Sequence, residues 1–193
     1  MRTVQAIICL LFIPIFTLMA SDRTEKQKYR VVHREKEFEI RYYPSATLAT
    51  VYSQASSYRE LAYPGFRKLA DYIFGGNENN TKIAMTSPVH MDINDSLSAM
   101  SFVMPSAYDL DKLPKPSNAN VKLQKSEAEY VAAIRFKGYA SDKSIQGQTE
   151  KLRKMLEEQG ILYDGHFRYL GYNPPYQFIG RRNEIIVSVQ WEE

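Results

Sequence analysis

The sequence predicts an α+β domain in which two helices pack outside an antiparallel sheet or barrel. Two segments have the spacing of amphipathic helices, and strand-like segments with period-two alternation lie before and after each of them. Most neighbouring strand segments are separated by short connections. Such connections favour antiparallel pairing, whereas a doubly wound parallel sheet needs a helical crossover between neighbouring strands.

The first strand expected is residues 38–43. Phe38, Ile40 and Tyr42 alternate there with more polar residues, which is typical of a half-buried strand. Pro44 and Ser45 turn the chain. Residues 47–52 then form a second strand or continue the first.

Residues 56–74 are expected to be a helix. Pro64 must lie near its start or kink it, because proline has no N–H to donate. Gly75, Gly76 and Asn77 end the helix, since these residue types tolerate positive φ. Strands are expected at 82–91 and 100–104. Five apolar residues share one helix face: Ala62, Phe66, Leu69, Ala70 and Ile73.

The second half of the chain repeats this order of elements without obvious sequence repetition. It begins with a long Pro-, Ser- and Asp-rich connection over 105–119. The second helix is capped by Ser141 or Asp142 and ends before Gly160. The strands expected in this half are 121–123, 130–136, 167–172 and 184–191.

The N-terminus has the composition of a secretory signal peptide. Arg2 precedes an apolar run over residues 6–16, which is too short for a comfortable membrane span. We expect residues 1–20 to be removed after Ala20, and the protein to be secreted or periplasmic. A retained N-terminal membrane anchor is the alternative, because Leu18 stands where signal peptidases prefer a small residue. Membrane contact is expected only through this segment.

The remaining chain is expected to comprise a linker over 21–29 and one domain over 30–193. Removal of the signal peptide also removes Cys9, the only cysteine, so no disulfide is expected. The formal net charge of the whole chain is +3, which predicts no strong attraction to nucleic acid. We expect a monomer.

Signals for catalysis are absent from the sequence. No phosphate-binding loop, zinc-protease helix or nucleophile-elbow motif occurs, and His33, His90 and His166 lack metal-ligand spacing. Four methionines, at 85, 91, 100 and 104, favour adaptable core packing over a soft-metal site. We therefore expect a binding module rather than an enzyme.

Seven ordered blocks together resemble the SOUL/haem-binding protein family over about residues 29–191. The blocks are FEIRYY at 38–43, GFxxLxxYI at 65–73, KIAMTSPV at 82–89, FVMP at 102–105, LPxP at 113–116, GYNPP at 171–175 and GRRNE at 180–184. The resemblance implies a distorted antiparallel β-barrel of two pseudo-repeats with two outer helices. It also implies non-covalent haem or other porphyrin binding in a shallow apolar cleft beside the first helix.

Candidate binding residues follow from what a porphyrin needs, which is an apolar slot and cations for its propionates. The slot would combine Phe66, Leu69, Ala70 and Ile73 of the first helix with Phe178 and Ile179 of a later loop. Core packing is the other interpretation of the helix residues. The cations would be Arg181 and Arg182, with Arg67 and Lys68 nearby; the alternative is that these are structural pairs and a solvated face.

Tyr42 is the candidate axial ligand, because some family members have a histidine at the comparable position. Tyrosinate ligates ferric iron in other proteins. The strand alternation equally places Tyr42 in the core. The resulting hypothesis is an exported, weak or transient haem carrier or buffer. The alternative is a GyrI-like domain that binds another apolar small molecule or a protein partner.

Overall fold

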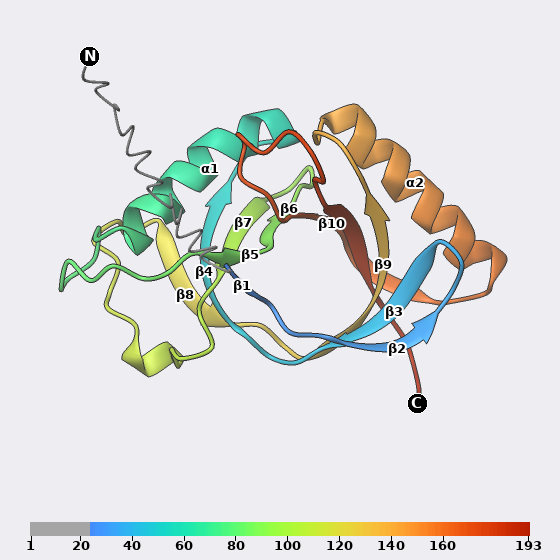
Figure 1. Ribbon diagram of the computed structural model, residues 1–193, viewed down its shortest axis with the longest axis horizontal. Helices are drawn as coiled ribbons and strands as arrows, with labels where there is room; N and C mark the ends of the chain where they lie inside the picture. Colours follow the sequence, from blue (N-terminus) through green and yellow to red (C-terminus); the bar gives the residue numbers. More distant parts are fainter. Residues whose placement is uncertain (1–23) are drawn as a thin grey trace, which may run out of the picture.

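The structure, a computed structural model, describes residues 24–193. Figure 1 shows a strongly curled antiparallel sheet with both helices on its outer face. The nine strands of this sheet follow the order β2-β3-β9-β11-β10-β6-β7-β4-β8, and β1 and β5 form a separate parallel pair. The strands are β1 Glu25–Lys26, β2 Arg30–Arg34, β3 Phe38–Tyr43, β4 Thr47–Ser53, β5 Thr86–Ser87, β6 Val89–Asp92, β7 Ser98–Val103, β8 Val121–Lys125, β9 Glu129–Phe136, β10 Tyr163–Gly171 and β11 Asn183–Val189; the helices are α1 Tyr58–Ile73, α2 Asp142–Glu158 and a 3-10 turn at Leu110–Lys112.

The strand order confirms the two pseudo-repeats. One repeat is β3-β4-α1-β6-β7 and the other is β8-β9-α2-β10-β11. The first strand of each repeat pairs with the second strand of the other, β3 with β9 and β8 with β4. The two repeats also meet where β6 pairs with β10. Each repeat therefore completes the sheet of the other.

A single ladder joins β3–β4 to β8–β9 across a bend. Tyr43 pairs with Glu129 and Thr47 with Lys125, so the register is the same on both sides of the bend. At the bend, the Ala46 amide donates to Ser126 Oγ at 3.0 Å and the Ser126 amide donates to the Ala46 carbonyl at 2.9 Å. This bend curls the sheet as a barrel requires. Within residues 24–193 the outer strands β2 and β8 do not pair, so the expected barrel is an open one.

Helix α1 packs closely on the sheet, on a face slightly rotated from the one expected. Its buried residues are Leu61, Gly65, Leu69, Tyr72 and Ile73. Phe66 is only partly buried at the rim of this face. The centre of the face is Gly65, where a Cβ atom would lie 3.2 Å from the Met100 side chain. The apolar pattern did not reveal this close approach because glycine has no side chain to count.

The ends of both helices agree with their sequence signals. The Glu60 amide donates to Ser57 Oγ at 3.3 Å, and Pro64 lies inside α1 rather than at its start. Gly75, just beyond α1, has φ of 116°. Ser141 caps α2 in a reciprocal arrangement with Ser144.

Several segments differ from expectation. β2 forms where no strand was expected, and β10 begins four residues before the strand expected at 167–172. The strand expected over 82–91 is divided into β5 and β6 because Pro88, between them, has no N–H for a ladder. Lys82 makes only an isolated bridge to Phe74. The expected linker 21–29 includes β1, which pairs with β5. The signal-peptide prediction for residues 1–20 lies outside the described residues.

The main core lies between the helices and the outer face of the sheet. Met91, Met100 and Met104 are buried in it, which agrees with their interpretation as core residues. A smaller apolar cluster lies on the inner face and includes Tyr43, Leu170 and Ile186. In residues 24–193, none of the helices has both the length and the apolar character needed to cross a membrane.

Replacing Leu69 with alanine should lower the free energy of unfolding by about 2–5 kcal/mol, because it leaves a cavity under α1. Leu69 is fully buried, whereas Leu162 is 64% exposed. Leu162→Ala is therefore the matched control and should change stability by less than about 0.5 kcal/mol. Urea unfolding measures both values. Similar values for the two variants would contradict the described packing of α1.

Candidate functional site

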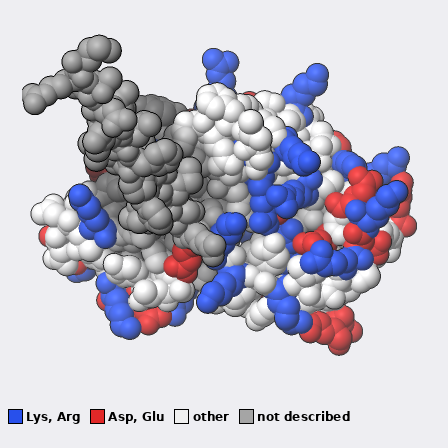
Figure 2. Space-filling view, viewed as in Figure 1, with Lys and Arg blue, Asp and Glu red and all other residues white. Residues whose placement is uncertain are grey.

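A loop with exposed apolar side chains joins β10 to β11. Tyr176, Phe178 and Ile179 are 76%, 77% and 88% exposed. Figure 1 shows this loop close to the N-terminal ends of α1 and α2. We call these three residues, with Tyr139 beside them, the loop platform. In Figure 2 the surface over this loop carries mainly uncharged residues, with Lys and Arg at its margin.

Hydrogen bonds hold the loop platform in one conformation. Nη1 of Arg181 donates to the carbonyls of Pro174, at 2.7 Å, and Gln177, at 2.9 Å. The Tyr139 hydroxyl donates to the Pro175 carbonyl at 3.2 Å. The guanidinium of Arg181 also lies 4.4 Å from the centre of the Tyr139 ring. The apolar side chains therefore project from a braced backbone.

Neither predicted propionate-binding arginine faces the surface of the loop. Arg181 is 8% exposed because its guanidinium is turned inward to the loop carbonyls. Arg182 donates to Glu184 at 2.9 Å and to the Tyr29 hydroxyl at 2.9 Å. Both arginines therefore make structural contacts, Arg181 with loop carbonyls and Arg182 with Glu184. Sequence periodicity could not distinguish the binding interpretation from the structural one. The inward turn of Arg181 depends on the path of the loop, and the position of Arg182 depends on Tyr29, which is remote in sequence.

The predicted α1 residues divide into two groups. Leu69 and Ile73 are fully buried in the core and do not face the loop platform. Phe66 and Ala70 are partly exposed, and the Phe66 ring packs edge-on against Phe102 at 5.2 Å. The structure therefore does not bring the predicted residues together as one slot.

Exposed cations on α1 are the cations that a ligand could reach. Arg59 and Arg67 are exposed, and Lys68 is partly buried. The Arg67 guanidinium lies 6.0 Å from the centre of the Tyr63 ring, which is itself 72% exposed. Sequence reasoning did not single out Tyr63 as part of the site.

Tyr42 lies away from the loop platform. Its ring packs against Tyr130 at 5.2 Å, and Arg30 lies 5.6 Å from its centre. Figure 1 shows β3 on the opposite side of the curled sheet from the loop between β10 and β11. The strand that carries Tyr42 and the loop that carries Phe178 therefore lie on different sides of the sheet (Figure 1).

A buried ion cluster supports the base of the loop on the inner face of the sheet. Glu184 accepts from Arg41 at 2.8 Å, from Arg182 at 2.9 Å and from the Tyr172 hydroxyl at 2.9 Å. Burial opposes ionisation of Glu184, but the hydrogen bonds and charges of the two arginines outweigh it and hold the pKa of the carboxyl below its ordinary value. The carboxylate of Glu184 is therefore fully engaged by its neighbours.

The histidines are dispersed, as their spacing indicated. His33 packs against Trp191 at 5.2 Å, and His90 contacts the Gln27 side chain at 2.7 Å. Desolvation and the charge of Arg168 lower the pKa of His90 to about 3, so this ring is neutral at pH 7. Across residues 24–193, no three His, Cys, Asp or Glu side chains converge as metal ligands.

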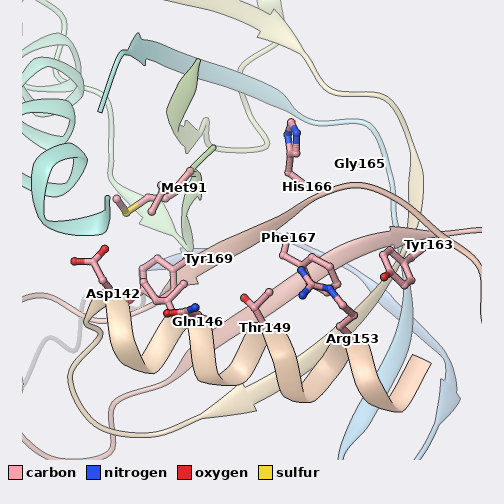
Figure 3. A pocket seen from close by; sticks show the side chains of 12 residues that line it. Met91, Asp142, Gln146, Thr149, Arg153, Tyr163, Gly165, His166, Phe167 and Tyr169 are labelled. Carbon is pink, nitrogen blue, oxygen red and sulfur yellow. The ribbon is translucent and has the colours of Figure 1, made fainter. Parts of the chain in front are cut away.

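A cleft of about 510 Å³ lies between α2 and β10 (Figure 3). Met91, Ile145 and Phe167 are among its apolar lining residues, and Arg153 and His166 are among its polar ones. Sequence analysis did not find this cleft, because its walls come from three separate segments.

Comparison with known proteins identifies relatives over most of the chain. A family model described as SOUL heme-binding protein matches residues 24–188. Heme-binding protein 2 of Homo sapiens is 31% identical over 157 residues, which cover 77% of this chain and 76% of that protein. Heme-binding protein 1 of Xenopus laevis is 28% identical over 155 residues, covering 77% and 81%.

Solved structures with the same fold have much lower sequence identity. The C-terminal domain of EcmrR aligns with a TM-score of 0.61 at 13% identity, covering 80% of this chain and 97% of that one. A hydrolase from Listeria innocua aligns with a TM-score of 0.58 at 11% identity, covering 82% and 94%. At these identities the likeness concerns the fold alone.

Glu184→Gln should lower the free energy of unfolding by about 3–5 kcal/mol at pH 7, because it leaves Arg182 without a buried counter-charge and Arg41 with only the partly buried Glu39. The folded-state pKa of Glu184 is depressed, so its stabilisation is complete above the unfolded pKa and is lost as the pH falls through the folded pKa. Urea unfolding between pH 7 and pH 3 should therefore show a shallower decline for Glu184→Gln than for the wild type. Parallel profiles would contradict this assignment. Glu158→Gln, at the exposed end of α2, is the control and should behave like the wild type.

Proposed function

This chain belongs to the SOUL heme-binding protein family, and from that premise we propose that it binds haem or another tetrapyrrole on the loop platform. Binding is non-covalent and the protein acts as a monomer. The role is that of a binding module rather than an enzyme. The curated relatives named above are heme-binding proteins, which supports the ligand class.

The observation that carries this proposal is the exposure of Phe178 and Ile179 on a braced loop. Large apolar side chains that remain 77% and 88% exposed are unfavourable in water unless a partner covers them. Because Arg181 and Tyr139 already hold the backbone, covering these side chains orders little additional chain. A flat macrocycle matches a surface of this kind.

The neighbouring face of α1 supplies the remaining contacts. Arg59, exposed in the first turn of α1 close to the loop (Figure 1), is the cation placed to meet a propionate. Arg181 acts indirectly, as the residue that positions the loop. Arg182 contributes through the ion cluster with Glu184 rather than by touching the ligand.

Affinity should be moderate, because the loop platform offers mainly apolar contact and no histidine to ligate iron. No histidine lies in the loop over 173–182. Weak binding permits rapid release, which suits a carrier or a buffer. A protein partner, or another apolar small molecule, would use the same exposed aromatic side chains, and the experiment below separates that outcome from haem binding.

Titration of the purified protein with hemin should give a saturable Soret shift at micromolar hemin. Phe178→Ser/Ile179→Ser should weaken binding about tenfold or more, since each buried apolar side chain contributes about 1.5–3 kcal/mol. Leu162→Ser removes an exposed apolar side chain elsewhere and should bind like the wild type. Tyr42→Phe should leave the ferric spectrum unchanged.

Absence of a Soret shift in the wild type would overturn haem binding itself. A shift that survives the double substitution would overturn the site but not the ligand. If hemin does not bind, the alternative partner is sought among the small molecules and proteins that copurify with the protein from its own host, and mass spectrometry identifies it. The Phe178→Ser/Ile179→Ser variant should not retain that partner.

We further propose that the protein is exported. Support comes from the Arg2 and 6–16 sequence pattern alone. Expression of the whole chain in a bacterium with a periplasm should yield a soluble periplasmic form that begins at Ser21, as intact-mass measurement would show. A full-length form in the membrane fraction would indicate the anchor instead, and a full-length cytoplasmic form would contradict both.

A further inference from the structure

The two pseudo-repeats pack their helices unequally. Helix α1 buries five residues, distributed from Leu61 to Ile73, whereas α2 buries only Leu152 and Leu156. Both buried residues of α2 lie in its C-terminal half. The N-terminal half, from Asp142 to Thr149, therefore lies over the sheet without closing onto it. The cleft of about 510 Å³ lies in this space (Figure 3).

An irregularity in β10 forms the other wall of the cleft. The pairing of β10 with β11 shifts register between Asp164 and Arg168, and β6 pairs with β10 only from Arg168 onward. Gly165 lies in the bulge with φ of 73°, a conformation that favours glycine. Residues 165–167 are therefore unpaired in the ladder, and Phe167 points toward α2 (Figure 3). Bulges of this kind often re-aim side chains beside binding sites.

The lining is apolar in the middle and cationic near one end. Met91 and Phe167 lie on the sheet side and Ile145 on the helix side. Arg153 extends from α2 toward Phe167, and its guanidinium lies 5.1 Å from the centre of that ring. Figure 3 shows His166 on the sheet side above Phe167.

The negative charges around the cleft already have partners. Asp142, at the far end, accepts the Tyr58 amide at 2.6 Å and lies in the first turn of α2, where the helix dipole favours an anion. Glu150 engages Nη1 of Arg153 at 2.6 Å, which orients the guanidinium. Asp92 lies 3.6 Å from Nδ1 of His166.

We propose that this cleft is a second ligand site, separate from the loop platform, which takes a planar aromatic carboxylate. The aromatic ring packs between Phe167 and the side chains of Met91 and Ile145. The carboxylate meets the guanidinium of Arg153. Cavities of this size, mainly apolar with few convergent polar groups, are typical of small-molecule sites. The inference does not depend on haem binding.

Methyl NMR of ¹³C-methionine-labelled protein tests the site with 2-naphthoate, because Met91 lines the cleft. The Met91 methyl signal, assigned with Met91→Leu, should shift saturably as 2-naphthoate is added. 2-Naphthylmethanol, with the same rings but no charge, should bind about tenfold more weakly, since a charge-assisted contact is lost. Arg153→Gln should weaken naphthoate binding about tenfold and leave naphthylmethanol binding unchanged.

Two further variants test whether binding is specific to Arg153 and to the cleft. Lys154→Gln removes the adjacent cation, whose side chain is 77% exposed, and should bind naphthoate like the wild type. Thr149→Trp should fill the cleft and abolish the Met91 shift while the circular dichroism spectrum stays native. The proposal is overturned if naphthoate leaves Met91 unshifted, if Arg153→Gln binds normally, or if Phe178→Ser/Ile179→Ser abolishes the shift.

Discussion

The uninterrupted ladder between β3–β4 and β8–β9 is the constraint on which the rest of the structure depends. Its register continues from Tyr43–Glu129 to Thr47–Lys125, so both strands must bend together. The bend turns the two ends of the sheet toward each other, and each pseudo-repeat then completes the sheet of the other. Because β4 leads into α1 and β9 into α2, the ladder also decides where the helices pack.

Curling the sheet encloses polar groups on its inner face, and these groups must pair there. Glu184 pairs with both Arg41 and Arg182, and its replacement would leave Arg182 without a buried counter-charge. Arg182 and its neighbour Arg181 follow the loop between β10 and β11. One arginine is fixed to the buried cluster and the other to the loop carbonyls, so the exposed side chains of Phe178 and Ile179 rest on an ordered base.

The same repeat unit produces two different surfaces because its copies diverge in packing. Gly65 lets α1 approach Met100 closely and seal its half of the sheet. In the second pseudo-repeat, the bulge at Gly165 interrupts β10 opposite α2, and a cleft remains between the strand and the helix. The proposed carboxylate site thus results from the difference in helix packing and strand regularity between the two halves.

The sequence by itself determined the α+β class, the order of the main elements, a cap at Ser141 or Asp142 and the methionines as core residues, because these depend on local periodicity and residue chemistry. It also pointed to Phe178 and Ile179 as exposed apolar residues of a loop. Only the tertiary structure decided that Arg181 and Arg182 turn inward, that Tyr42 lies apart, and that a cleft opens under α2. Those features depend on the path of a loop, on partners remote in sequence or on a register shift, and no local pattern records any of these.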